Sequence, residues 1–430
     1  MLDSLRISSP KRSSRASADW EAFFPYYAGY PVSFASELLS SAKLSKDAVV
    51  LDPWNGSGTT TYAAARLGLL SRGFDLNPAM IVVARARHLP PSEADSIAPL
   101  AREISRSIEE CTRVDGEEAL AVWFGRKTAG VIRSLELAIR HCLVGSQTIT
   151  PRGVNIDQIS GLAATFYVGL FALCRELSEK FKSSNPTWIR HPRGDETRIG
   201  VPKDQICDRF IARMSEMAVA LAARDDLFSI EQAQSDLRIA DTTAIALAPS
   251  SVDFVLTSPP YCTRIDYTAA TRVELAVLAP LLDVPVKELG RKMIGSTRVP
   301  LHDVQVSPTW GIRCEQFLES LKRHPSKASS GYYYRTHIDY FDKLSKSVEN
   351  VSLGLKSSGV AVFVVQDSYY KDLHNDVPAI LADIAQERGL FLKRREDFQL
   401  SRLMSGINSR SRVYKRESSA VEAVLCFQKA

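Results

Sequence analysis

The chain has 430 residues, of which 45% are hydrophobic and 24% are charged, a composition typical of folded globular proteins rather than of disordered or fibrous ones. No apolar run is long enough to span a membrane and the N-terminus has no apolar signal segment, so we expect a cytoplasmic protein without a membrane partner. Subtracting 49 acidic from 54 basic side chains gives a net charge of +5, which is compatible with a polyanionic partner but too small to identify one.

The cysteines point neither to disulfides nor to a metal site. There are seven, they are scattered, and no two have the CxxC spacing. The histidines do not pair with them at metal-ligand spacing. We therefore expect free thiols in a reducing compartment and no bound metal.

The N-terminal region has two parts. Residues 1–18 are rich in Ser, Arg and Lys, which predicts a disordered basic arm that either contacts a phosphate backbone or is simply solvated. An aromatic cluster follows from Trp20 to Tyr30. Apolar residues at helical spacing then begin at Phe34.

The next stretch predicts a βαβα unit. Residues 48–51 form a short apolar strand that ends in a glycine-containing loop, and an Ala-rich helix follows to Gly68. A second strand at 71–75 leads into another helix that runs through Arg87. This alternation predicts a parallel sheet with helices on both faces.

Helical periodicity dominates the region 89–227, which we interpret as a helical insertion. Helices are expected at 94–112, 117–144, 157–183 and 203–224. The insertion either buttresses the sheet or serves as a target-recognition or DNA-clamping domain.

The sheet pattern resumes near residue 228, so that residues 19–88 and 228–430 form one predicted catalytic domain. Strands are expected at 227–230, 237–239, 252–256, 360–365 and 421–427, helices at 264–284, 337–356 and 376–388, and irregular structure at 285–333.

The strand at 252–256 ends in Thr-Ser-Pro-Pro-Tyr at residues 257–261. Two adjacent prolines have no N–H to donate to a ladder, so the strand ends here in a stiff turn. The turn carries a hydroxyl, carbonyls and an aromatic ring at a strand's carboxyl end, where ligands bind in open α/β sheets. We interpret it as a turn that holds a nucleobase by its exocyclic amino group.

The first strand ends in a second candidate site, the loop at residues 52–59. Gly56 and Gly58 allow the backbone to approach a ligand closely. Asp75 ends the following strand, where a carboxylate accepts hydrogen bonds from ribose hydroxyls. The loop has one glycine fewer than a dinucleotide fingerprint and no P-loop lysine, which indicates a ribose without a pyrophosphate.

Two further carboxylates refine this ligand. Asp52 suits an ammonium group, and Asp241, at the end of a third strand, suits an adenine amino group. A nucleoside that carries an amino acid fits this set, and S-adenosylmethionine is such a molecule.

These motifs resemble those of the S-adenosylmethionine-dependent amino-methyltransferases of DNA, especially the N4-cytosine type. Asp-Pro-Trp-Asn-Gly-Ser-Gly-Thr at 52–59 is similar to their cofactor loop, and Gly-Phe-Asp-Leu-Asn-Pro at 73–78 to their ribose site. Residues 252–261 resemble their catalytic motif. Residues 30–34 resemble the N-terminal motif that wraps the methionine end of the cofactor.

The resemblance covers residues 20–88 and 228–430 and implies an α/β fold with a Rossmann-like methyltransferase sheet, mostly parallel with a late antiparallel strand. In two features the chain departs from the family. The cofactor loop precedes the catalytic turn, the reverse of the commonest class with Ser-Pro-Pro-Tyr. The insertion also falls before the Asp241 strand, whereas the recognition domain of the class with this order usually follows it.

The resemblance also assigns residues. It implies cofactor contacts for Tyr30, Phe34, Asp52, Pro53, Gly56, Ser57, Gly58, Thr59, Asp75 and Asp241, and a catalytic turn of Ser258, Pro259, Pro260 and Tyr261. The substrate it implies is a cytosine flipped out of double-stranded DNA, its amine held by Ser258 and Pro259 and its ring stacked on Tyr261. A covalent route through Cys262 is disfavoured, because the nucleophilic cysteine of the carbon-5 enzymes follows a proline and Cys262 follows a tyrosine.

Basic residues interleaved with aromatic ones predict the DNA contacts. They gather at 182–198, 291–335 and 393–416, and we take Lys182, Trp188, Arg190, Arg193, Arg298, Arg410 and Arg412 as candidates. We find no nuclease constellation, so a partnered restriction endonuclease or defence-system protein would be a separate chain.

Three other functions remain open. The same turn can act on the N6 amine of adenine, although Ser before Pro-Pro-Tyr favours cytosine. An RNA methyltransferase is a second alternative, and a catalytically silent DNA-binding subunit is a third.

Overall fold

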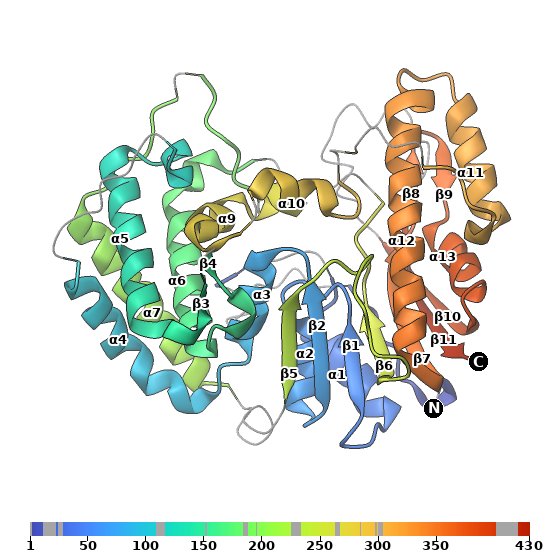
Figure 1. The fold of residues 1–430 in the computed structure, drawn as a ribbon, viewed down its shortest axis with the longest axis horizontal. Coiled ribbons are helices and arrows are strands. Elements are labelled where there is room, and N and C mark those ends of the chain that lie inside the picture. The colour runs from blue at the N-terminus through green and yellow to red at the C-terminus, as the bar shows by residue number, and fades with distance from the viewer. Residues whose placement is uncertain are drawn as a thin grey trace.

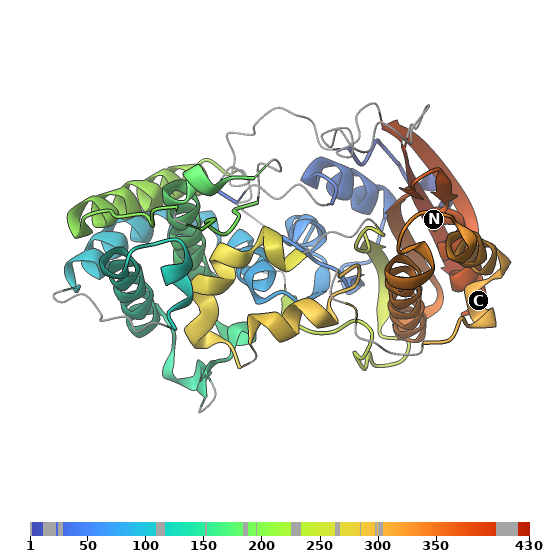
Figure 2. The same cartoon turned by 90° about the horizontal axis from the view of Figure 1, so that it is seen from above.

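The computed structural model describes residues 2–11, 23–24, 29–108, 117–150, 153–183, 188–194, 196–224, 234–262, 267–283, 285–296, 299, 304–400 and 420–430. A seven-stranded sheet lies in the middle of the molecule, and a group of helices stands at one end of it (Figures 1 and 2). Within these ranges no helix is long and apolar enough to cross a membrane.

The sheet is mostly parallel. Its strands lie in the order β10 (Leu390–Leu400), β11 (Ala420–Lys429), β7 (Leu355–Gln366), β6 (Val252–Thr257), β1 (Val49–Asp52), β2 (Leu70–Asp75) and β5 (Ser235–Ile239). Neighbours from β7 to β5 pair in parallel, whereas β11 runs antiparallel to both β7 and β10. This order confirms the expected Rossmann-like methyltransferase sheet with a late antiparallel strand.

The central strands are buried on both faces. Val50 packs into one hydrophobic cluster and Leu51 into another, because successive strand residues point to opposite faces. The helices of the first cluster are α1 (Val32–Ala42) and α2 (Thr59–Arg66), and those of the second are α11 (Ile312–Arg323), α12 (Tyr334–Gly354) and α13 (Val377–Gln386). Because β1, β2 and β6 are adjacent and parallel, the residues that follow them meet at one edge of the sheet.

The helical insertion is present as expected. It contains α4 (Ala94–Arg106), α5 (Arg126–Leu143), α6 (Gly161–Leu177) and α7 (Lys203–Ala222), with a small hairpin of β3 (Ile149–Thr150) and β4 (Gly153–Val154). These helices pack on one another, and α6 packs on α3 (Pro78–Arg87) beside the sheet (Figure 1). Its role in target recognition or DNA clamping stays a prediction.

The chain that follows the Pro-Pro turn joins this insertion. The predicted helix at 264–284 is divided into α8 (Tyr267–Ala270) and α9 (Arg272–Leu278), and α9 packs on α6. The α6 residue Arg175 pairs with the buried Glu274 of α9 and donates to the carbonyl of Ala270 over 2.7 Å.

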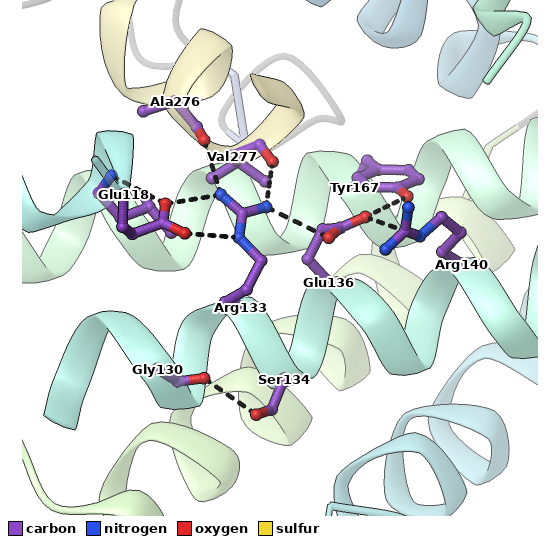
Figure 3. Close-up of polar contacts among 10 residues, drawn as sticks. Glu118, Gly130, Arg133, Ser134, Glu136, Arg140, Tyr167, Ala276 and Val277 are labelled. Atoms are coloured by element: carbon purple, nitrogen blue, oxygen red, sulfur yellow. Dashed lines mark hydrogen bonds and ion pairs between the residues drawn. The ribbon is translucent and has the colours of Figure 1, made fainter. Parts of the chain in front are cut away.

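Arg133 of α5 makes the second connection (Figure 3). Its five N–H groups make five bonds: two to Glu118 at 2.8 and 3.1 Å, one to Glu136 at 3.2 Å, and one each to the carbonyls of Ala276 and Val277 at 3.0 and 2.7 Å. The last two bonds satisfy carbonyls in the final turn of α9, which have no partner within the helix. A buried arginine thus fixes α9 to the insertion.

Two regions differ from expectation, because their many charged residues conceal the apolar periodicity of the helices and the strand that they form. The region 285–333 contains α10 (Val286–Lys292) and α11, whose inner face is formed by Cys314, Phe317, Leu318 and Leu321. Residues 390–400 of the basic C-terminal stretch form β10, paired along its length with β11. The strand expected at 227–230 lies outside the described residues.

The N-terminal arm is also ordered where it is described. Leu5 is buried, and the Arg6 N–H donates to Ser41 Oγ over 2.8 Å. Arg394 of β10 donates to the Leu5 carbonyl over 2.9 Å. The disorder predicted for residues 1–18 is therefore wrong for residues 2–11, because Leu2, Leu5 and Ile7 supply apolar contacts to the sheet's first cluster.

Replacing Arg133 with Met should lower the free energy of unfolding by about 3–5 kcal/mol, because two carboxylates would lose a buried partner. Arg323→Gln, which breaks an exposed pair with Glu319, should cost at most about 1 kcal/mol. Urea denaturation of both variants checks the difference, and equal losses would show that the Arg133 network does not hold the insertion to α9.

Candidate functional site

One pocket at the carboxyl edge of the sheet brings the two predicted halves of the site together. Its lining includes Tyr30, Asp52, Gly56, Ser57, Thr59, Asp75 and Asp241 of the predicted cofactor set, and all of Ser258, Pro259, Pro260 and Tyr261. The remaining candidates, Phe34, Pro53 and Gly58, are not among the residues that line the pocket. Phe34 packs on Tyr30 with ring centroids 5.0 Å apart, and the Pro53 carbonyl accepts from Thr242 Oγ1 over 2.7 Å.

The glycines of the 52–59 loop are required by its geometry. Gly56 and Gly58 have φ angles of +48° and +81°, in the left-handed region that favours glycine. A Cβ atom on Gly58 would lie 2.7 Å from the Cβ of Ala84 in α3. The loop can therefore turn tightly into α2 only with glycine at this position.

Asp52 ties the two halves of the pocket to each other. Its Oδ1 accepts from Thr257 Oγ1 at 2.6 Å and from the Trp54 N–H at 3.1 Å, and its Oδ2 accepts from Thr60 Oγ1 at 2.5 Å. Tyr30 extends this chain through a 2.6 Å bond between its hydroxyl and that of Thr60. Burial raises the pKa of Asp52 from 3.8 to about 6, and the three hydrogen bonds oppose that rise.

Asp75 is arranged as an acceptor that faces the pocket. Its two oxygens accept one backbone bond each, from Gly56 at 2.9 Å and from Asn77 at 2.8 Å. Each carboxylate oxygen has two lone pairs, so one acceptor position per oxygen remains for a ligand. Burial raises the pKa of Asp75 to about 6. Asp241, also in the lining, uses Oδ1 to accept from the Thr243 N–H and hydroxyl.

The turn at 258–261 is held from the later part of the chain. The buried Tyr340 of α12 donates to the Pro260 carbonyl over 2.9 Å. The Tyr261 hydroxyl donates to Oε1 of Glu422 in β11 over 3.4 Å. Ser258 is half-buried and faces the pocket, so its hydroxyl is available to a ligand.

Cys262 is a structural thiol. It is buried, and its sulfur accepts from Asn375 Nδ2 over 3.4 Å. Burial raises its pKa to about 12, so the thiol stays protonated near neutral pH. This environment agrees with the expectation that Cys262 is not a nucleophile.

Trp54, Asn55, Leu76 and Asn77 also line the pocket; they lie within the two recognised motifs but were not assigned as individual contacts. The lining residues that the sequence did not predict are Gly29, Met80, Ala240, Thr242, Thr271, Lys292, Met293 and Ile294. Asn77 had a local signal, since it precedes a proline and caps α3 by accepting from the Ala79 N–H. Its Nδ2 also donates to Thr271 Oγ1 over 2.8 Å. Thr271 and residues 292–294 carry no local signal, because tertiary packing alone brings them to the pocket.

The candidate DNA-contacting side chains differ in exposure and in whether a carboxylate of the protein already pairs with them. Arg190 makes two bonds to Glu196, at 2.6 and 2.7 Å, and Lys182 pairs with Glu179 at 2.6 Å. Trp188 is half-buried, whereas the Arg193 side chain is exposed. Arg298, Arg410 and Arg412 lie outside the described residues.

Comparison with known proteins gives distant relatives of one kind. No family model matches the chain. The Type II methyltransferase M.BsoBI of Geobacillus stearothermophilus is 23% identical over 295 residues, which are 63% of this chain and 55% of that relative's length. The Type II methyltransferases M.AvaI of Nostoc sp. and Anabaena variabilis are 20% identical over 418 residues, 90% of this chain and 82% of theirs.

The solved structure of the rRNA methyltransferase aviRa from Streptomyces viridochromogenes is also similar. The alignment covers 94% of this chain and 87% of the aviRa chain. The identity is 12% and the TM-score 0.31, too low to support a conclusion. The chain is thus similar in sequence to Type II methyltransferases, at low identity.

The raised pKa of Asp52 leads to a test of its burial. Its carboxyl binds a proton more tightly in the folded chain than in the unfolded one, so folding is favoured at low pH and disfavoured as pH rises through about 6. Between about pH 4 and pH 7, the unfolding free energy of the wild type should fall relative to that of Asp52→Asn, on the order of 3 kcal/mol. Urea denaturation at several pH values measures the gap, and a gap independent of pH would contradict the burial.

Proposed function

We propose that the chain transfers a methyl group from S-adenosylmethionine to the exocyclic N4 amine of a cytosine flipped out of double-stranded DNA. The observation that carries this proposal is the shared pocket. The 52–59 loop, Asp75 and the 258–261 turn line the same cavity, and the Thr257–Asp52 hydrogen bond joins its two halves. The similarity to Type II methyltransferases supports methyl transfer to DNA, the coarser part of this proposal.

The residues of the pocket fit this cofactor. S-adenosylmethionine, when bound, supplies an electrophilic methyl group on a sulfonium sulfur. Asp75 would accept from the ribose hydroxyls with its two remaining acceptor positions, and Asp241 would accept from the adenine amine. Asn55 also lies in the lining, and its Oδ1 accepts from Thr61 Oγ1 over 3.1 Å.

The turn would prepare the amine for reaction. A cytosine amine is a poor nucleophile because its lone pair is delocalised into the ring. The Ser258 hydroxyl and the Pro259 carbonyl are fixed acceptors that would hold its hydrogens and favour tetrahedral geometry at nitrogen. Tyr340 keeps the neighbouring Pro260 carbonyl occupied, which orients the turn without using the reacting groups. Positioning therefore supplies most of the rate enhancement.

The flipped base would be recognised by its ring as well as its amine. Tyr261 would stack on the extruded base, because an aromatic face replaces the stacking that the base loses when it leaves the duplex.

The assignment predicts different defects for the two halves of the pocket. Ser258→Ala and Tyr261→Ala should lower methyl transfer by about 100-fold or more without changing cofactor affinity, since both side chains face the base. Asp75→Asn should weaken cofactor binding by about 10- to 100-fold, because it removes a charged acceptor. Tritiated-methyl transfer to DNA and cofactor titration measure the two effects.

Nucleoside analysis of the labelled DNA then identifies the product. N4-methylcytosine is the expected nucleoside. N6-methyladenine would contradict the choice of base, label confined to RNA would contradict the substrate, and no transfer would favour a silent subunit. Full transfer by Tyr261→Ala with lost cofactor affinity would overturn the division of roles.

The predicted DNA contacts can be tested separately. Arg193→Gln should reduce the slope of log affinity against log salt by about one, because it removes a phosphate contact. Lys182→Gln and Arg190→Gln should each change the slope less, since Glu179 and Glu196 already pair with these side chains. Lys46→Gln is the control, because Lys46 is exposed and precedes β1, at the end of that strand opposite the pocket. Slopes that stay unchanged in every variant would refute the predicted DNA contacts.

A further inference from the structure

The pocket lining carries a positive charge that the roles given above do not use. Its acidic side chains, Asp52, Asp75 and Asp241, belong to the proposed cofactor site, and Lys292 is the only basic side chain among the described residues that line it. Lys292 is the last residue of α10, a helix that lies above the carboxyl edge of the sheet (Figure 1). A cation at this place suits an anionic group of a ligand.

The ammonium group of Lys292 is available to such a ligand. Its side chain is exposed, and no carboxylate of the described residues pairs with it. The nearby Lys343 is engaged by comparison. Its ammonium lies 2.9 Å from Asp339 Oδ2 and donates to the carbonyls of Arg291 and Met293 over 3.4 Å each. An ammonium group has three donors, so Lys343 uses all of its own, whereas those of Lys292 remain for a partner.

Helix α12 places Lys292 on the side of the pocket that the catalytic turn forms. Tyr340 donates to the Pro260 carbonyl over 2.9 Å, and Lys343 donates to the carbonyls of the two residues on either side of Lys292. Tyr340 and Lys343 are three positions apart, so they lie on the same face of α12. One helix face thus contacts both the turn and the backbone around Lys292.

The residues beside Lys292 also pack against the chain that follows the turn. Ile294 belongs to the same buried cluster as Cys262. Gly290 lies so close to α8 that a Cβ atom on it would be 3.2 Å from Thr268 Oγ1. Lys292 is therefore held by packed neighbours next to the turn proposed to hold the base.

We propose that Lys292 binds the backbone phosphate of the nucleotide that is flipped into the pocket. The inference rests on the proposed function, because a base held by Ser258 and Tyr261 brings its own sugar and phosphate with it. The carboxylates of the lining repel a phosphate, and a cation on the side of the turn offsets that repulsion. Lysine suits this role because its ammonium acts as a point charge toward phosphate. The contact positions the nucleotide without reading its base.

The test uses free nucleotides, which require no recognition sequence. Deoxycytidine and deoxyadenosine are each compared with their 5′-monophosphates by equilibrium dialysis, with S-adenosylhomocysteine saturating the cofactor site. The wild type should bind a monophosphate more tightly than its nucleoside. Lys292→Gln should weaken binding of that monophosphate by about 3- to 10-fold and leave binding of the nucleoside unchanged. Arg291→Gln is the matched control, because Arg291 is the exposed basic neighbour and is not among the residues that line the pocket.

Three outcomes would overturn the phosphate contact. One is a wild type that binds neither monophosphate better than its nucleoside. Another is an equal loss in Lys292→Gln and Arg291→Gln. The third concerns the other anion that could reach this lysine, the carboxylate of the cofactor. If Lys292→Gln weakened binding of S-adenosylmethionine but not of 5′-methylthioadenosine, which lacks the amino acid, the lysine would hold that carboxylate instead.

These binding ratios require no catalysis, so they separate the phosphate contact from the proposed function. A chain that methylates no DNA, yet loses its preference for the monophosphate in Lys292→Gln, would refute the proposed function and support the contact. A chain that methylates DNA and binds the monophosphate equally well in Lys292→Gln would support the function and refute the contact.

Discussion

The buried carboxylate of Asp52 is the constraint on which the pocket depends. It accepts from the strand β6 through Thr257, from the loop through Trp54 and from α2 through Thr60. A buried carboxylate is costly unless donors surround it, so these three segments must keep their places for the fold to tolerate it. One residue thereby sets the distance between the loop that would hold a methyl donor and the turn that would hold its acceptor.

The walls of the pocket depend on two groups of helices far from this carboxylate. On one side, Arg133 and Arg175 of the insertion hold α9, and Thr271 at its start reaches Asn77 in the lining. On the other side, Tyr340 of α12 holds the turn through the Pro260 carbonyl. The insertion is thus part of the pocket's architecture, whatever it contributes to the recognition of DNA.

Local patterns predicted six of the seven strands of the sheet, most helices and the loop and turn residues, because each of these follows from periodicity or from a proline or glycine at a fixed place. Two kinds of structural feature could not be predicted from these patterns. Helix α11 and strand β10 carry many charges, which concealed their apolar faces, and Leu5 is too isolated in a basic segment to predict burial. Thr271 and Lys292 reach the pocket only through tertiary packing, and no spacing along the chain encodes that. Thr257 was part of a recognised motif, yet its bond to Asp52 joins residues 205 positions apart.

The order of the two halves along the chain does not disturb their meeting. β1 and β6 are neighbours in the sheet and parallel, so the loop after one and the turn after the other emerge side by side whichever comes first in sequence. Three residues from the last third of the chain also hold the turn in place. Tyr340 contacts Pro260, Asn375 contacts Cys262, and Glu422 contacts Tyr261. Since Cys262 is buried and protonated, the turn has no thiolate to offer as a nucleophile. The chemistry proposed for the turn relies instead on fixed acceptors and an aromatic face, and those three contacts hold the turn in place.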